Sequence, residues 1–211
     1  MKKLIFVFLL AALIATPLAA LDLSAGGDLS LAHEWNTVKD KAKETTSMNL
    51  LGINGFFDAE YVRAALGVNF SVSGYTNKHT TSNGDSHAFT DSKYSFTNLR
   101  ISVLGKYPFT IANIIKIYPL AGMEFDLNIS AKNDGEDLKK RISDEQKNDL
   151  NHYYLVLGAG ADITIVKNFF ISPKATFGFD LRKNSHAKNN PNLKGGHTMK
   201  LEFGVGVGYK F

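Results

Sequence analysis

Residues 199–211 read MKLEFGVGVGYKF, and this stretch decides the fold. Every second position in it is apolar: Met199, Leu201, Phe203, Val205, Val207, Tyr209 and Phe211. The positions between them hold lysine, glutamate or glycine. Because successive side chains of a strand point to opposite faces, this pattern predicts a long β-strand with one apolar and one polar face.

The same alternation recurs along the chain, at residues 21–31, 62–72, 99–103, 115–129, 153–165 and 169–181. Residues 48–57 also indicate a strand, but both of their phases are apolar and the facing stays open. The chain therefore contains eight predicted strands. An internal repeat supports hairpins, since residues 110–127 and 164–181 are identical at eight of eighteen positions. The repeat carries Pro119 and Pro173, each of which lacks a ladder donor and so predicts a bulge.

Strand length and loop layout distinguish a membrane barrel from a soluble β-sandwich. The predicted strands are about ten to thirteen residues long, whereas about nine to eleven suffice to cross a bilayer and globular strands average about five to six. Long polar gaps at 36–46, 77–93, 131–150 and 183–198 alternate with short gaps at 58–60, 107–114 and 166–168. A sandwich has no reason to sort its loops in this way. We therefore expect an all-β fold, an eight-stranded antiparallel up-and-down transmembrane β-barrel.

The first twenty residues have a different composition from the rest. Lys2 and Lys3 precede an apolar run at 4–14, and Pro17 and the pair Ala19-Ala20 follow it. This order predicts a cleaved signal peptide at 1–20 and a barrel at 21–211; a short membrane anchor or a buried helix is the alternative. Removal of two lysines lowers the net charge from +4 to +2. We therefore expect export and no nucleic-acid partner, and the absence of cysteine excludes disulfides and thiolate metal sites.

With these features, the chain resembles the small eight-stranded bacterial outer-membrane barrels of the OmpA/OmpX/OmpW type. The resemblance rests on the last strand, whose Val205, Val207, Tyr209 and Phe211 share one phase and end on an aromatic residue. It implies a bacterial outer-membrane location and recognition of this aromatic-ended strand by the barrel-assembly machinery. No motif selects one subfamily.

The inward phase of the predicted barrel is rich in charge of both signs. Its acids are Asp22, Asp28, Glu34, Glu124, Asp126, Asp162, Asp180 and Glu202, and its bases are Arg63, Arg100, Lys106, Lys116, Lys174, Arg182, Lys200 and Lys210. Since a buried charge needs a partner, we expect a structural network in the lumen. Its members are Arg63, Arg100, Lys116, Glu124, Asp126, Asp162, Lys174, Asp180, Arg182, Lys200 and Glu202. An eight-stranded barrel filled in this way is largely plugged.

Two functions follow from this lumen. The first is a structural or surface-interaction role for a plugged barrel that presents four extracellular loops. The alternative is a narrow porin-like channel for small or apolar solutes, as the OmpW resemblance suggests. Inward glycines at positions such as 158, 160, 204, 206 and 208 either open a water path or make room for opposing side chains.

No set of residues predicts catalysis, a cofactor or a metal centre. Asp91-Ser92 with His33, and His197-Thr198-Met199, are weak matches to lipid-modifying enzymes. Four histidines, at positions 79, 87, 186 and 197, are candidate metal ligands but are more simply solvated. Lys183, Lys188 and Lys194 make one loop cationic. Expected partners are outer-membrane lipid, lipopolysaccharide-type headgroups and a host or surface ligand at the loops, with the protein a monomer.

Overall fold

The computed structural model describes residues 22–39, 42–72, 74–81, 85–91, 94–112, 114–183, 188–189 and 193–211. The predicted signal peptide at 1–20 lies outside these residues. The described elements are almost all strands. They are β1 (Leu23–Lys39), β2 (Lys43–Ala59), β3 (Val62–Ser71), β4 (Tyr75–Thr80), β5 (Ser86–Asp91), β6 (Tyr94–Lys106), β7 (Phe109–Ala112), β8 (Ile115–Asn133), β9 (Glu136–Asp137), η2 (Leu138–Lys140), α2 (Asp144–Asp149), β10 (His152–Val166), β11 (Phe169–Lys183) and β12 (Lys194–Lys210).

Eight of these strands close into a ring. Their order is β1-β12-β11-β10-β8-β6-β3-β2, and β2 pairs with β1 again. All of the pairings are antiparallel. The eight-stranded antiparallel barrel expected from the alternation is confirmed.

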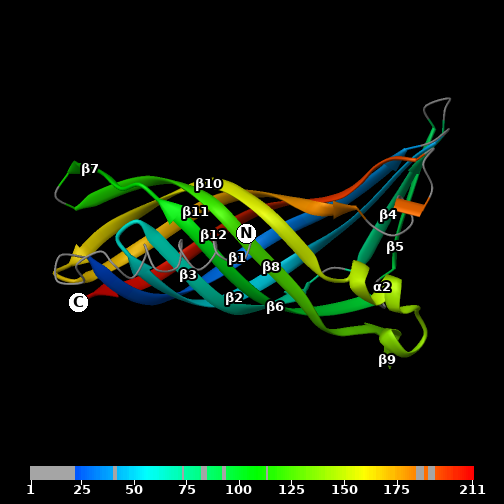
Figure 1. Cartoon of the computed structure of the whole chain (residues 1–211), viewed down its shortest axis with the longest axis horizontal. Helices are drawn as coiled ribbons and strands as arrows, with labels where there is room; N and C mark the ends of the chain where they lie inside the picture. The colour runs from blue at the N-terminus through cyan, green and yellow to red at the C-terminus, as the bar shows by residue number, and fades with distance from the viewer. Residues whose placement is uncertain are drawn as a thin grey trace, which may run out of the picture.

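The two ends of the barrel differ (Figure 1). At one end, called here the loop end, lie α2, β9 and the β4–β5 hairpin. At the other, called the turn end, lie β7 and the C-terminus. Within the described residues, neither helix has the length and apolar character that a membrane crossing requires.

At the loop end the strands continue further than their apolar pattern predicts. Most of the predicted loop 36–46 is strand, because β1 and β2 remain paired as far as Lys39 and Lys43. The predicted loop 77–93 contains the paired strands β4 and β5, and β8 extends to Asn133. Backbone pairing does not depend on side-chain polarity, so polar pairs such as Thr37 and Thr45 extend the sheet.

Strand β2 has a definite facing, which its sequence leaves open. Leu50, Asn54 and Phe56 point into the ring and are buried, whereas Ile53 and Phe57 point outward and are exposed. The inward-facing residues of β2 include apolar ones because the lumen also contains aromatic side chains. Phe56, for example, lies against Phe170 with ring centroids 6.3 Å apart.

Neither proline lies in a bulge itself, but the register of each hairpin shifts near the turn end, between Thr110 and Ala112 and between Thr164 and Val166. Pro119 pairs with Ala159 within an unbroken register between β8 and β10. On the other side of β8, Pro119 lies between two pairing partners. The pairing with β6 ends at Leu120, and the pairing with β7 begins at Ile117. Pro173 keeps register with Val205 of β12. Each proline is accommodated where one neighbouring ladder is interrupted, so neither strand needs an extra residue.

Candidate functional site

The inside of the ring is a packed set of buried charges. Of the described residues, eight acids are buried there: Asp28, Glu34, Asp58, Glu124, Asp126, Asp162, Asp180 and Glu202. The bases are Arg63, Arg100, Lys106 and Lys200, together with Lys174, whose side chain is 9% exposed. Apart from His152, which bonds Asp180, the buried set therefore contains three more acids than bases, and not the equal numbers expected from sequence.

Toward the turn end, one cluster is centred on Asp58. Arg63 donates to both of its carboxylate oxygens at 2.7 Å, and Lys106 Nζ lies 2.9 Å from Oδ2. The Arg63 guanidinium also lies 4.4 Å from the centre of the Phe56 ring. Asp162 completes the cluster by accepting hydrogen bonds from Tyr118 at 2.8 Å and Ser172 at 2.9 Å.

A second cluster fills the middle of the lumen. Arg100 Nε lies 3.2 Å from Glu124 and 3.1 Å from Asp126, and Arg100 also pairs with Glu202. Lys200 bridges Glu124 and Asp126. Arg100 on β6 and Asp126 on β8 are opposite each other on neighbouring strands, whereas the pairs that Glu202 and Lys200 of β12 make with β6 and β8 cross the ring. Lys174 on β11 lies 3.2 Å from Asp28 on β1 and 3.5 Å from Glu202.

Two residues predicted for the network lie at the rims. Lys116 pairs at 2.5 Å with Asp22, whose side chain is 64% exposed. This hydrogen bond lowers the pKa of Asp22. At the loop end, Arg182 donates to the carbonyl oxygens of Asn148 and Asn151 and stacks over Tyr153. Asp180 lies inside and accepts from His152 Nδ1 at 2.7 Å. Lys116 and Arg182 are separated from the clusters because their strands reach the rims there.

Sequence reasoning missed Asp58, the centre of the first cluster. It falls in the gap 58–60, which its polarity suggests is a turn, yet β2 continues to Ala59. The available signal was the period of two, since Asn54, Phe56 and Asp58 all lie on the inward phase.

The inward glycines make room for opposing side chains. A Cβ at Gly160 would lie 2.6 Å from the Tyr118 ring, and one at Gly208 would lie 2.2 Å from the Phe170 ring. A Cβ at Gly204 would lie 2.7 Å from the Lys174 side chain. Their space is therefore occupied by neighbouring atoms, and their number does not indicate an open path.

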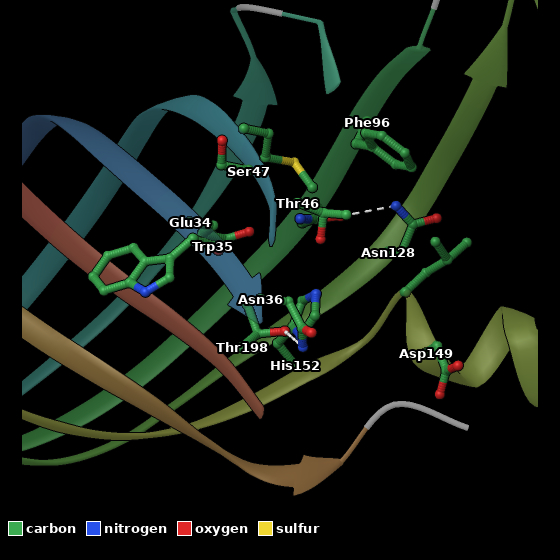
Figure 2. A pocket seen from close by; sticks show the side chains of 13 residues that line it. Glu34, Trp35, Asn36, Thr46, Ser47, Phe96, Asn128, Asp149, His152 and Thr198 are labelled. Carbon is green, nitrogen blue, oxygen red and sulfur yellow. Dashed lines mark hydrogen bonds between the residues drawn. The ribbon is translucent and has the colours of Figure 1, made fainter. Parts of the chain in front are cut away.

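Above the clusters, a cavity of about 230 Å³ opens at the loop end (Figure 2). We call it the mouth cavity. Its lining consists of Glu34, Trp35, Asn36, Thr46, Ser47, Met48, Phe96, Asn98, Asn128, Asp149, Leu150, His152 and Thr198. Asp149 and Leu150, at the end of α2, border it from the loop side, so it combines polar walls with Met48, Phe96 and Leu150.

Two acceptor atoms of this lining lack a donor among the described residues. Glu34 is 2% exposed, and its Oε1 accepts from Tyr154 at 3.0 Å, whereas its Oε2 has no partner. Asn128 Nδ2 donates to Asn98 Oδ1 at 2.8 Å and to Ser130 O at 3.1 Å, which leaves Asn128 Oδ1 without a partner. Because buried polar atoms are nearly always satisfied, both atoms require an explanation.

Of the weak catalytic candidates, only some lie among the described residues. His33 bonds Asn49 at 2.8 Å, and Ser92 lies outside the described residues. His197 bonds the carbonyl oxygen of Asp180 and stacks on Phe179. His79 and His87 lie opposite each other on β4 and β5, and His186 lies outside the described residues. No cluster of three or more metal-binding side chains occurs in the described part of the chain.

The outer surface of the ring is apolar. The four residues of the C-terminal signature, Val205, Val207, Tyr209 and Phe211, are exposed on this surface. Aromatic residues gather at the turn end, where Tyr107 packs against Phe109 and Phe169 against Tyr209. Trp35 packs against Phe177 further toward the loop end. This arrangement matches the apolar band and aromatic girdles of a transmembrane barrel.

Comparison with known proteins identifies the same architecture. A family model described as outer membrane protein beta-barrel domain matches residues 6–211. The structure of Neisserial surface protein A (NspA) is 16% identical, with 90% of this chain and 97% of that chain covered and a TM-score of 0.50. OprG from Pseudomonas aeruginosa is 13% identical, with 91% and 96% covered and a TM-score of 0.49. Ail of Yersinia pestis, solved with a heparin analogue, is 12% identical, with 90% and 99% covered and a TM-score of 0.38. No curated protein matches the sequence.

Proposed function

The chain belongs to the outer membrane protein β-barrel domain family, and from that premise we propose that it is a closed structural barrel that presents its loops at the surface of the bacterial outer membrane. In this proposal the lumen is a structural core and the loop end carries the interactions. The protein works as a monomer, without catalysis or cofactor.

The observation that carries the proposal is the packing of the middle of the lumen. Arg100, Lys200 and Glu202 are almost fully buried and bond across the ring at one level. A continuous water path would hydrate these groups, and their mutual bonds would then contribute little. Eight strands leave an interior that side chains are just able to fill, in agreement with a plug.

The alternative, a narrow channel for small or apolar solutes, needs a continuous path past these ion pairs. Planar-bilayer recording of the purified full chain separates the two functions. The closed barrel predicts no stable single-channel steps at low voltage. Arg100→Ala, which shortens the largest side chain of the central cluster, is recorded beside the unmodified chain for comparison. Stable steps from the unmodified chain would refute the closed barrel.

Partners are proposed for the two ends separately. At the loop end, exposed Lys183, Lys188 and Lys194 attract anionic groups, such as lipopolysaccharide-type headgroups or an anionic host surface. At the turn end, the exposed face of β12 that ends at Phe211 is presented to the assembly machinery during biogenesis. Replacing the three lysines with glutamine is expected to lower adhesion to anionic surfaces, and unchanged adhesion would remove the host-binding role.

A further inference from the structure

We propose that the mouth cavity binds a small primary ammonium compound with an apolar body. This inference concerns a site above the plug, and it goes beyond the structural role because it gives the loop end a specific ligand class.

The first argument is the polarity of the unpartnered atoms. Glu34 Oε2 and Asn128 Oδ1 are both acceptors, and both belong to residues that line the cavity. A ligand that satisfies them must bring donors. An ammonium group brings three donors and a positive charge, whereas a carboxylate or phosphate would add only acceptors beside Glu34.

The second argument is the charge balance. Without His152, which lines the same cavity and bonds Asp180, the buried lumen set contains three more acids than bases. Glu34 is the acid of that set that lines the cavity. The cations below it are bonded elsewhere, since Arg100 pairs with Asp126 and Glu202, and Lys200 with Glu124. The phenol of Tyr154 supplies Glu34 with a hydrogen bond but no charge. A buried carboxylate in this position favours a cation.

The third argument is size and lining. A volume of about 230 Å³ is large for one water molecule and small beside the pockets of drug-sized ligands. Met48, Phe96 and Leu150 supply apolar contacts, and Figure 2 shows Phe96 on the side of the cavity across from Glu34. The space therefore suits an ammonium head with a short hydrocarbon or a single ring. The chain itself makes the same type of contact at this end, where Lys139 Nζ donates to Asn128 O at 2.6 Å.

The test uses the full chain in detergent micelles and isothermal titration with benzylamine and benzyl alcohol, which share a ring and differ in the head group. Benzylamine is expected to bind, and Glu34→Gln is expected to weaken its binding by about tenfold or more, because one charge-assisted hydrogen bond is lost. The matched control is Asp144→Asn, which removes the same charge from exposed α2 and leaves the affinity unchanged.

A second variant guards against misfolding of the first. Thr46→Trp keeps the Glu34 carboxylate and fills the cavity, so it is also expected to abolish benzylamine binding while the strand signal in circular dichroism is retained. The single tryptophan of the unmodified chain, Trp35, directly follows Glu34 and has its ring against Phe177 on the outer face, and it gives an independent fluorescence readout. Equal affinity of benzylamine for the unmodified chain and Glu34→Gln would overturn the proposal. Equal affinity for benzyl alcohol would do the same, because the ring and not the ammonium group would then determine binding. Binding of neither compound would also overturn the proposal and would identify a water-filled vestibule.

Discussion

Asp58→Asn is the perturbation that most clearly probes the packed lumen. Asp58 is 0% exposed and accepts two hydrogen bonds from Arg63 and one from Lys106. The substitution keeps the shape of the side chain and removes its charge, so two buried cations lose their main partner. Breaking a buried ion pair from one side costs about 3–5 kcal/mol. Asp162 lies 3.7 Å from both cations and offsets part of the loss, so we expect about 3 kcal/mol.

The assay is equilibrium unfolding of the full chain in detergent by guanidinium chloride, followed by the fluorescence of Trp35. Asp22→Asn is the matched control, because Asp22 also pairs with a lysine but its side chain is 64% exposed. It should cost less than about 1 kcal/mol. If the two variants lose the same stability, Asp58 is hydrated, and the description of the lumen as a packed core is wrong.

Three further perturbations test other parts of the structure. Gly122→Ala would place a Cβ 2.2 Å from Val103 O and should lower the free energy of unfolding by about 1–3 kcal/mol. Gly105→Ala, whose Cβ would lie 3.4 Å from Ala121 O, should lower it less. Equal losses of stability would contradict the close approach of the strands at Gly122. Tyr154→Phe removes the donor to Glu34 and should destabilise the barrel by about 1–3 kcal/mol in the same unfolding assay, while Tyr61→Phe in an exposed turn should have little effect. Phe211→Ala should lower the amount of protein recovered in the outer-membrane fraction, and Phe203→Ala, on the same exposed face, should not; equal recovery would remove the assembly role of the C-terminal residue.

Much of the fold could be predicted from sequence because the alternation of apolar and polar residues in each strand indicates which face contacts lipid. The alternation in 199–211 is a direct consequence of the exposed face of β12, which carries Phe203, Val205 and Val207. The alternation does not indicate the facing of β2, because inward Leu50 and Phe56 are apolar like their outward neighbours. It also fails at strand ends, where β1 and β2 continue as paired polar strands beyond the apolar band.

The candidate site was predictable in part. The inward charges of β6, β8 and β12 follow from the alternation, because residues such as Arg100, Asp126 and Glu202 alternate with apolar neighbours. Their partners could not be predicted, since pairs such as Arg100 with Glu202 join strands that are distant in sequence. The mouth cavity depends on where Leu150 and Asp149 settle over the ring, and no local pattern records that position.

The central claim is that the lumen is closed, and thiol labelling tests it most directly because the chain has no cysteine of its own. Ser102→Cys places a thiol among the buried inward side chains of β6, and Ser95→Cys places one at the exposed loop end of the same strand. A charged, water-soluble thiol reagent should label the Ser95 variant rapidly and the Ser102 variant slower by about a hundredfold or more, since a closed lumen excludes the reagent. Similar labelling rates at the two positions would mean that water reaches the centre of the barrel, and would contradict the account.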